Sequence, residues 1–180
     1  MELIGAVLVV VDMQTGFLND NSKSIIPAVV ALIDKCARRG IPSVFTKFIN
    51  QPESPYEILM GWQRVRDSPE TDLHTAFFSR AEIVLEKHFY TAFTSEFDDL
   101  VRKNDWRSIL ISGVSTESCV LKTAVDAFER GLRPVVIGEA CASDIGPDVH
   151  RMGLEILEVL IGKDQITSAD RLFLPTDPDN

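Results

Sequence analysis

The chain has 180 residues, a length that suits a single domain with one hydrophobic core. Apolar residues make up 45% of it, which is enough for the core of a three-layer protein. The net charge of −9 disfavours nucleic acids and anionic membranes as partners, because both are themselves negatively charged.

The cysteine content and the apolar runs indicate the cellular compartment in which the protein functions. The 3 cysteines show no spacing typical of a disulfide framework, which favours a reducing environment. The apolar run near the N-terminus lacks the basic start of a signal peptide, and no run reaches the length of a membrane span. We therefore expect a cytoplasmic protein without a membrane partner.

Strand-like and helical patterns alternate along the chain. The apolar run 6–11 predicts a first strand, and helical spacing of apolar residues over 25–39 predicts a helix that ends at Gly40. Further strands are predicted at 42–48, 82–87, 107–112, 134–138 and 165–168, and further helices at 95–103, 117–130 and 147–161. This alternation is typical of an α/β fold, in which helices cover both faces of a mostly parallel sheet.

The segment 50–80 interrupts this alternation. It contains several prolines and the aromatic residues Tyr56, Trp62, Phe77 and Phe78. Connections of this length are usually functional or disordered, and the aromatic residues favour an ordered segment. We predict a lid or a specificity loop over the strand ends. The alternative is a surface insertion that packs for stability or for contact between copies of the chain.

Cys119 lies where a predicted buried strand is followed by a predicted helix. Ser115 or Thr116 suits the N-cap of that helix, and Glu117 places an acid in its first turn. Free backbone N–H groups and the helix dipole stabilise a thiolate at this position. The same N–H groups can hold an oxyanion, so one short segment can supply a nucleophile and its oxyanion hole.

Two other residues also follow predicted strands. Asp12 ends the first apolar run, and Lys87 ends the strand 82–87. Catalytic groups in open α/β sheets gather outside the carboxyl ends of the strands, and an acid, a lysine and a cysteine can act as base, charge support and nucleophile. The ordinary alternatives are a turn-capping aspartate, a solvated lysine and a buried apolar cysteine. Cys36 and Cys141 fit the last description.

Several motifs share their order with one known family. They are Val10-Val-Asp-Met-Gln14, Glu86-Lys87, Tyr90-Thr-Ala-Phe93, Gly113-Val-Ser-Thr-Glu-Ser-Cys-Val120 and Gly138-Glu-Ala-Cys-Ala-Ser143. Together they resemble the isochorismatase-like cysteine hydrolases, a superfamily that includes nicotinamidases, N-carbamoylsarcosine amidases and ureide or biuret hydrolases. The resemblance implies a Rossmann-like three-layer α/β/α domain over residues 1–180, with a six-stranded sheet in the order 3-2-1-4-5-6.

The resemblance also implies roles for individual residues. Asp12, Lys87 and Cys119 would form a catalytic triad, in which Asp12 is the general base and Cys119 the nucleophile. Lys87 would keep Asp12 ionised and lower the pKa of the thiol. A cis peptide bond at Val114–Ser115 would turn the N–H groups of Ser115 and Cys119 toward a shared oxyanion hole.

Substrate contacts and metal binding follow less directly from the sequence. We expect substrate contacts from Gln14, Phe17, Trp62 and Phe89, and we leave Glu117 and Arg64 as either substrate contacts or solvated groups. His74, His88 and His150 are scattered and lack metal-ligand spacing. Metal-dependent nicotinamidases carry an Asp-x-His pattern after the second strand, where this chain has Lys47-Phe-Ile-Asn-Gln51. We therefore expect neither a metal nor a cofactor.

These features predict a cysteine-dependent hydrolase that cleaves a C–N bond in a small amide, ureide or carbamoyl substrate through a thioester. One alternative is an isochorismatase-type vinyl-ether hydrolase, whose chemistry needs the acid but no sulfur. The other is a non-enzymatic binding or redox protein on the same scaffold. We expect a small-molecule substrate and a homo-oligomer, either a dimer or a tetramer.

Overall fold

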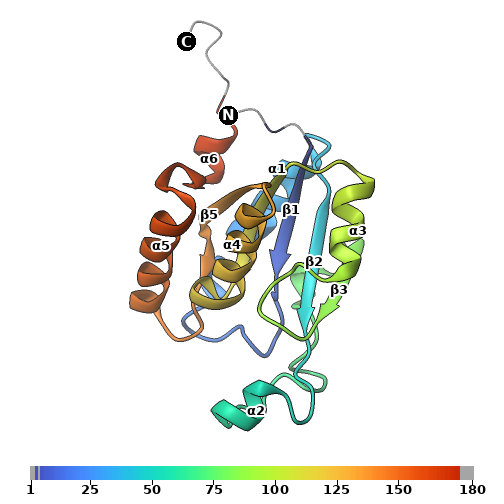
Figure 1. The fold of residues 1–180 in the computed structure, drawn as a ribbon, viewed down its shortest axis with the longest axis vertical. Coiled ribbons are helices and arrows are strands. Elements are labelled where there is room, and N and C mark those ends of the chain that lie inside the picture. The colour runs from blue at the N-terminus through green and yellow to red at the C-terminus, as the bar shows by residue number, and fades with distance from the viewer. Residues whose placement is uncertain (1–2, 4, 175–180) are drawn as a thin grey trace, which may run out of the picture.

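The computed structural model describes residue 3 and residues 5–174. Its centre is a six-stranded sheet in the order β3-β2-β1-β4-β5-β6, flanked by helices on both faces (Figure 1). All neighbouring strands pair in parallel, which confirms the predicted fold class and strand order. The extreme ends of the predicted domain 1–180 lie outside the described residues.

The strands begin and end near the predicted positions, with one exception. They are β1 Ala6–Val11, β2 Ser43–Phe48, β3 Ile83–Lys87, β4 Ser108–Val114, β5 Arg133–Ala142 and β6 Ile166–Thr167. The exception is β5, which continues well beyond its predicted end at residue 138. Its register against β4 shifts between Ile111 and Gly113, so that Gly113 pairs with Cys141. A bulge of this kind depends on the neighbouring strand and has no local signal in the sequence.

The four predicted helices are present, with a difference around Cys119, and the short helices α2 and α6 were not predicted. The α-helices are α1 Ile26–Ala37, α2 Pro55–Met60, α3 Ser95–Lys103, α4 Leu121–Glu129, α5 Pro147–Ile161 and α6 Ala169–Leu172. Short 3₁₀ turns span Lys23–Ile25, Thr75–Phe77 and Lys163–Gln165. The predicted helix 117–130 instead starts as a π-helical turn, Thr116–Val120, which then continues as α4. Single π-turns of this kind are frequent at functional sites.

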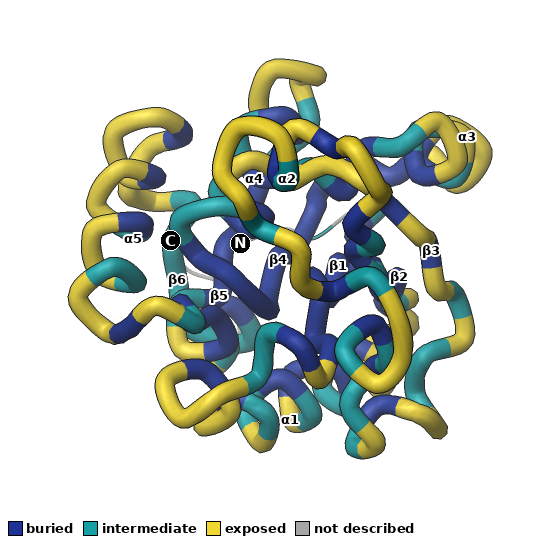
Figure 2. The backbone as a smooth tube through the Cα atoms, turned by 90° about the horizontal axis from the view of Figure 1, so that it is seen from below, coloured by how far each residue is buried: buried dark blue, intermediate teal, exposed yellow. Residues whose placement is uncertain are grey.

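Alternation along β1 explains how the sheet is held between its helices. Val7, Val9 and Val11 pack toward the residues of α3, α4 and α5, whereas Leu8 and Val10 pack toward α1. Figure 2 shows the central strands β1, β4 and β5 as a mostly buried centre surrounded by helices with exposed outer surfaces. Full burial of each such side chain is worth about 1.5–3 kcal/mol, so the sheet is a rigid support for the residues at its strand ends.

The segment 50–80 is ordered, and its first part, with α2, lies beyond the carboxyl ends of the strands (Figure 1). The Ser54 side chain caps α2 by accepting a hydrogen bond from the Glu57 N–H, and Gly61 ends the helix in a left-handed conformation. Within the described part of the chain, no helix has the length and apolar character needed to cross a membrane.

Candidate active site

Three strand ends converge on one buried cluster of polar side chains. Asp12 follows β1, Lys87 ends β3, and Cys119 lies in the π-helical turn after β4. Although β2 separates β1 from β3, the Lys87 Nζ reaches to 2.7 Å from Asp12 Oδ2 and 3.4 Å from Cys119 Sγ. The structure thus brings together the three residues that the sequence singles out from distant segments.

The Lys87 side chain is fully buried, and its ammonium group has several partners. Its ammonium group pairs with Asp12 and donates hydrogen bonds to the carbonyls of Phe89 and Tyr90 at 3.0 and 3.1 Å. Burial by itself lowers the pKa of Lys87, but the combined interactions with Asp12 and Cys119 outweigh it, and the net shift of the pKa is upward. Lys87 therefore carries a fixed positive charge beneath the site.

A second residue on β2 orients Asp12. The Thr46 hydroxyl donates a hydrogen bond of 2.6 Å to Asp12 Oδ1 and accepts the Asp12 N–H at 3.2 Å. Asp12 itself has a positive φ of 47°, which is uncommon for a residue other than glycine and occurs often at functional sites. The sequence analysis missed Thr46, although a buried hydroxyl inside the apolar strand 42–48 was a usable signal.

The thiol of Cys119 differs from the expectation. Only 6% of the residue is exposed, and burial raises the pKa of its thiol to about 12, although the charge of Lys87 acts in the opposite direction. Lys87 thus lowers the pKa of the thiol, as predicted, but burial outweighs it, and a stabilised thiolate at Cys119 stays a prediction. Desolvation dominates because the sulfur lies beneath the surface and not at an open helix end.

The backbone around Cys119 is tightly folded. The N–H groups of Ser118 and Val120, which flank Cys119, both donate to the Ser115 carbonyl at 3.1 Å. The peptide bond between Val114 and Ser115 is cis. The oxyanion-hole role of the Ser115 and Cys119 N–H groups stays a prediction.

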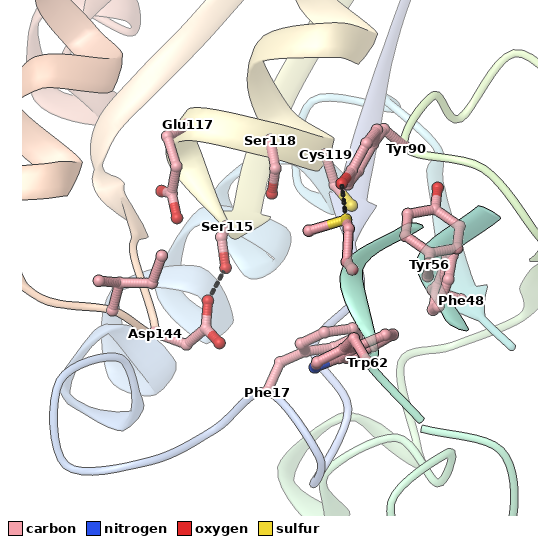
Figure 3. Close-up of a pocket in the computed structure, with 12 residues that line it drawn as sticks. Phe17, Phe48, Tyr56, Trp62, Tyr90, Ser115, Glu117, Ser118, Cys119 and Asp144 are labelled. Atoms are coloured by element: carbon pink, nitrogen blue, oxygen red, sulfur yellow. Dashed lines mark hydrogen bonds between the residues drawn. The ribbon is translucent and has the colours of Figure 1, made fainter. Parts of the chain in front are cut away.

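A cavity of about 290 Å³ opens onto Cys119 (Figure 3). Phe17 and Trp62, two of the four residues predicted to contact substrate, stack against each other in its wall at 6.2 Å between ring centroids. Tyr56, from α2, packs edge-on against Tyr90 at 5.2 Å. The remaining lining residues, most of them missed by the sequence analysis, are Phe48, Met60, Ser115, Glu117, Ser118, Asp144 and Ile145.

Comparison with known proteins identifies the family. Residues 6–170 match the model of the isochorismatase domain. The chain belongs to the isochorismatase family. It is a hydrolase of that family, and two relatives aligned over most of its length have names that denote amidohydrolases.

These relatives are distant but cover most of the chain. Nicotinamidase 3 of Arabidopsis thaliana is 25% identical over 175 residues, covering 93% of this chain and 86% of the relative. Maleamate amidohydrolase of Pseudomonas putida is 27% identical over 183 residues, covering 92% and 84%. The isochorismatase-like hydrolase from Alkaliphilus metalliredigens superposes with a TM-score of 0.81, at 17% identity and with 93% and 96% covered, which shows a shared fold.

The other two predicted substrate contacts do not line the cavity of this isochorismatase-family protein. The Gln14 side chain is completely buried and holds neighbouring loops, donating to the carbonyls of Phe48 and Thr71 at 2.9 and 3.0 Å. Phe89 is 63% exposed, and its carbonyl contacts Lys87. The structure therefore gives neither residue a place in the cavity wall, and substrate contact by Gln14 and Phe89 stays a prediction.

Of the two charged residues considered as possible substrate contacts, only Glu117 lines the cavity. Arg64 lies outside the cavity, where it pairs with Glu70 at 2.9 Å and donates to the Gly16 carbonyl. Glu117 lies in the cavity wall, and its Oε1 accepts a hydrogen bond of 2.9 Å from the Ser143 hydroxyl. Burial raises the pKa of Glu117. Asp144 lies beside it and accepts a hydrogen bond from the Ser115 hydroxyl.

The histidines lie apart and serve local contacts. His74 caps a 3₁₀ turn, His88 contacts the Ile49 carbonyl at 2.8 Å, and His150 contacts the Thr116 hydroxyl at 2.7 Å. Among the residues that the structure describes, no group of three or more His, Cys, Asp or Glu side chains is arranged to hold a metal ion. The expectation of a metal-free site stays a prediction.

Proposed function

We propose that the protein is a cysteine-dependent amidohydrolase that cleaves a C–N bond in a small amide, ureide or carbamoyl substrate through a thioester. The observation that carries this proposal is the position of the Lys87 Nζ, 2.7 Å from Asp12 Oδ2 and 3.4 Å from Cys119 Sγ, beneath a cavity. The names of the two amidohydrolase relatives support the same reaction class.

The first half of the reaction forms the thioester. The Asp12 carboxylate, whose proximity also raises the pKa of the Cys119 thiol, accepts the thiol proton as Sγ attacks the substrate carbonyl carbon. The tetrahedral intermediate then collapses with loss of its C–N bond. Asp12 returns the proton to the departing nitrogen, which leaves as ammonia or an amine.

The second half of the reaction returns the enzyme to its starting state. Asp12 accepts a proton from a water molecule as the water oxygen attacks the thioester carbonyl. The second tetrahedral intermediate loses its C–S bond, and the proton on Asp12 passes to Sγ. The product is a carboxylic or carbamic acid, and Asp12 is again a carboxylate beside the Lys87 ammonium.

The burial of the Cys119 thiol determines at which step its proton passes to Asp12. With a pKa of about 12, Cys119 holds its proton at neutral pH, so proton transfer to Asp12 accompanies the attack on the carbonyl. The fixed charge of Lys87 then stabilises the negative charge that passes through Asp12 and the sulfur. Lys87 therefore supports the base and the nucleophile together.

The oxyanion is assigned to backbone donors. We propose that the N–H groups of Ser115 and Cys119, in the turn that carries the nucleophile, bind the developing negative oxygen. The loss of one such donor typically costs about 10²–10³ in rate. The segment 50–80 is proposed to act as the lid, because Tyr56, Met60 and Trp62 come from it and line the cavity.

Trapping the covalent intermediate tests the proposal. The protein is mixed with a panel of small amides, ureides and carbamates, quenched in acid within milliseconds to seconds, digested and analysed by mass spectrometry. A substrate-derived acyl group on the peptide that contains Cys119, together with release of ammonia or amine, is the expected result. Hydrolysis of the panel that persists after complete alkylation of Cys119 contradicts the proposal, and cleavage of a vinyl ether with no turnover of the panel favours the alternative chemistry.

A further inference from the structure

The two walls of the cavity differ in chemical character. The rings of Phe17, Tyr56 and Trp62 lie on one side in Figure 3, and the carboxylates of Glu117 and Asp144 lie on the other. Among the described residues that line the cavity, none is a lysine or an arginine. The cavity surface therefore carries only acidic charge.

The Glu117 carboxylate is incompletely paired. Its Oε1 accepts a hydrogen bond from Ser143, but its Oε2 is buried and has no hydrogen-bond partner among the described residues. An unsatisfied buried carboxylate oxygen is costly, and it calls for a donor from a water molecule, an ion or a ligand. A donor that enters the cavity would remove this cost.

The Lys87 ammonium group beneath the cavity does not donate to Glu117. The Lys87 ammonium is buried and already contacts Asp12, Cys119 and two backbone carbonyls. A cation that compensates Glu117 and Asp144 must therefore come with the ligand. Aromatic faces favour the same kind of ligand, because a cation within about 6 Å of a ring centroid is attracted to the ring.

We propose that the substrate carries a cationic nitrogen group at the end remote from its scissile carbonyl, bound between the carboxylates of Glu117 and Asp144 and the aromatic wall. This inference rests on the proposed amidohydrolase function, because the scissile carbonyl must lie at Cys119. Amides that carry a carboxylate at the same position are disfavoured, since they would bring like charges together without a neutralising group.

An amide series with one variable end group tests the inference. The probes are 4-aminobutanamide, 4-hydroxybutanamide and glutaramate, which share the carboxamide and differ in a cationic, neutral or anionic end. We expect kcat/KM for the cationic amide to exceed that for the neutral amide by about tenfold or more, with the anionic amide slowest. Equal rates for the cationic and neutral amides, or a preference for glutaramate, overturn the inference.

Variants identify the groups responsible. Glu117→Gln and Asp144→Asn should each reduce the ratio of cationic to neutral kcat/KM several-fold. Asp148→Asn removes the same charge from an acid that is 90% exposed on α5, outside the cavity, and should leave the ratio unchanged. The ratio is measured within each variant, so it is independent of the amount of folded protein. An unchanged ratio in both cavity variants contradicts the inference.

Binding to Cys119→Ala separates this inference from the proposed reaction. Calorimetric titration of that variant with the three amides measures ligand preference without turnover. Preferred binding of the cationic amide, with no hydrolysis by the unaltered protein, supports the ligand class and contradicts the amidohydrolase function. Hydrolysis of amides without a preference for the cation supports the function and overturns the ligand class. Failure of the cationic amide to bind better than the neutral one also overturns it.

Discussion

The interior of α1 and the turn after β4 both bury a cysteine, yet they surround it very differently. Burial raises the pKa of Cys36 and of Cys119 to about 12 in each case. Cys36 packs within an apolar cluster that includes Leu32 and Ile33, whereas Cys119 contacts the Lys87 ammonium at 3.4 Å. The acidity of a resting thiol therefore does not identify the nucleophile here. The neighbouring Asp12 carboxylate and Lys87 ammonium support the proposed role of Cys119.

The same contrast applies to stability. The side of α1 that carries Cys36 gains free energy from apolar burial, and the ion pair of α1 between Asp34 and Arg80 lies outside that cluster. The β4 turn instead faces a buried ion pair between Asp12 and Lys87, and replacing such a pair with apolar residues is often neutral or stabilising. A buried ion pair beside a cavity is thus better explained by chemistry than by folding.

The largest expected effect comes from removing the nucleophile. Cys119→Ala deletes the sulfur that we propose forms the thioester, so kcat for a hydrolysed amide should fall by at least about 10⁴-fold. Because little volume is lost, the circular dichroism spectrum should stay that of the unaltered protein. Steady-state ammonia release measures the loss.

Cys36→Ala is the matched control for that variant. It removes an equally buried thiol and should cost on the order of 1 kcal/mol of stability, with kcat per folded molecule within about twofold of the unaltered protein. If Cys119→Ala keeps most of its activity, or if Cys36→Ala loses most of its own, the contrast between the two regions is wrong.

The second largest expected effect comes from removing Lys87, the cation that contacts Cys119. Lys87→Met leaves the buried Asp12 carboxylate without its ion-pair partner, and breaking one side of a buried pair typically costs about 3–5 kcal/mol. Urea denaturation should show a loss of this size, along with loss of turnover. The double variant Asp12→Asn/Lys87→Met should recover much of the stability but none of the activity. If Lys87→Met is as stable as the unaltered protein, Asp12 and Lys87 do not form a buried ion pair.

Much of this arrangement could be predicted from the sequence because it depends on local patterns. Apolar runs ending at Asp12 and Lys87 mark strand ends, and the parallel alternation places strand ends on one edge of the sheet. The π-helical turn around Cys119 was not predictable, since the residues 116–120 have no pattern that separates it from an ordinary first helical turn. The long register shift between β4 and β5 likewise depends on the pairing of two distant segments.

Side-chain positions were the hardest feature to predict. Gln14 and Phe89 follow strand ends and fit a substrate role by position, yet Gln14 is buried between loops, Phe89 is exposed, and neither lines the cavity. Thr46 was missed because its role depends on a hydrogen bond to a residue 34 positions away. The prediction for Lys87 was confirmed in one respect, its contact with Asp12 and Cys119. The strand order places β2 between β1 and β3, and the long lysine side chain can reach across β2.

The third prediction uses the raised pKa of the two thiols. Far below a pKa of about 12, the thiolate fraction of Cys119 grows tenfold for each pH unit. Its alkylation by iodoacetamide, followed by peptide mapping, should therefore still rise at pH 10, whereas an ordinary thiol with a pKa near 8.5 levels off at about pH 9–10. Cys36 is fully buried in the folded protein and should stay unmodified. A plateau for Cys119 below pH 8 means that Lys87 outweighs burial.

The smallest expected effect concerns Glu117, the half-paired carboxylate in the turn that carries Cys119. Because burial raises its pKa above 4.5, the folded state binds this proton more tightly than the unfolded state, and ionisation lowers stability as pH rises through that range. Glu117→Gln keeps an acceptor for Ser143 and should raise Tm at pH 7 by on the order of 2 °C, with the gain vanishing below pH 4.5. Glu158→Gln, at an exposed position of α5, should leave Tm unchanged. A lower Tm for Glu117→Gln at pH 7 would show that this charge stabilises the fold, and that the turn buries it for packing and not for a ligand.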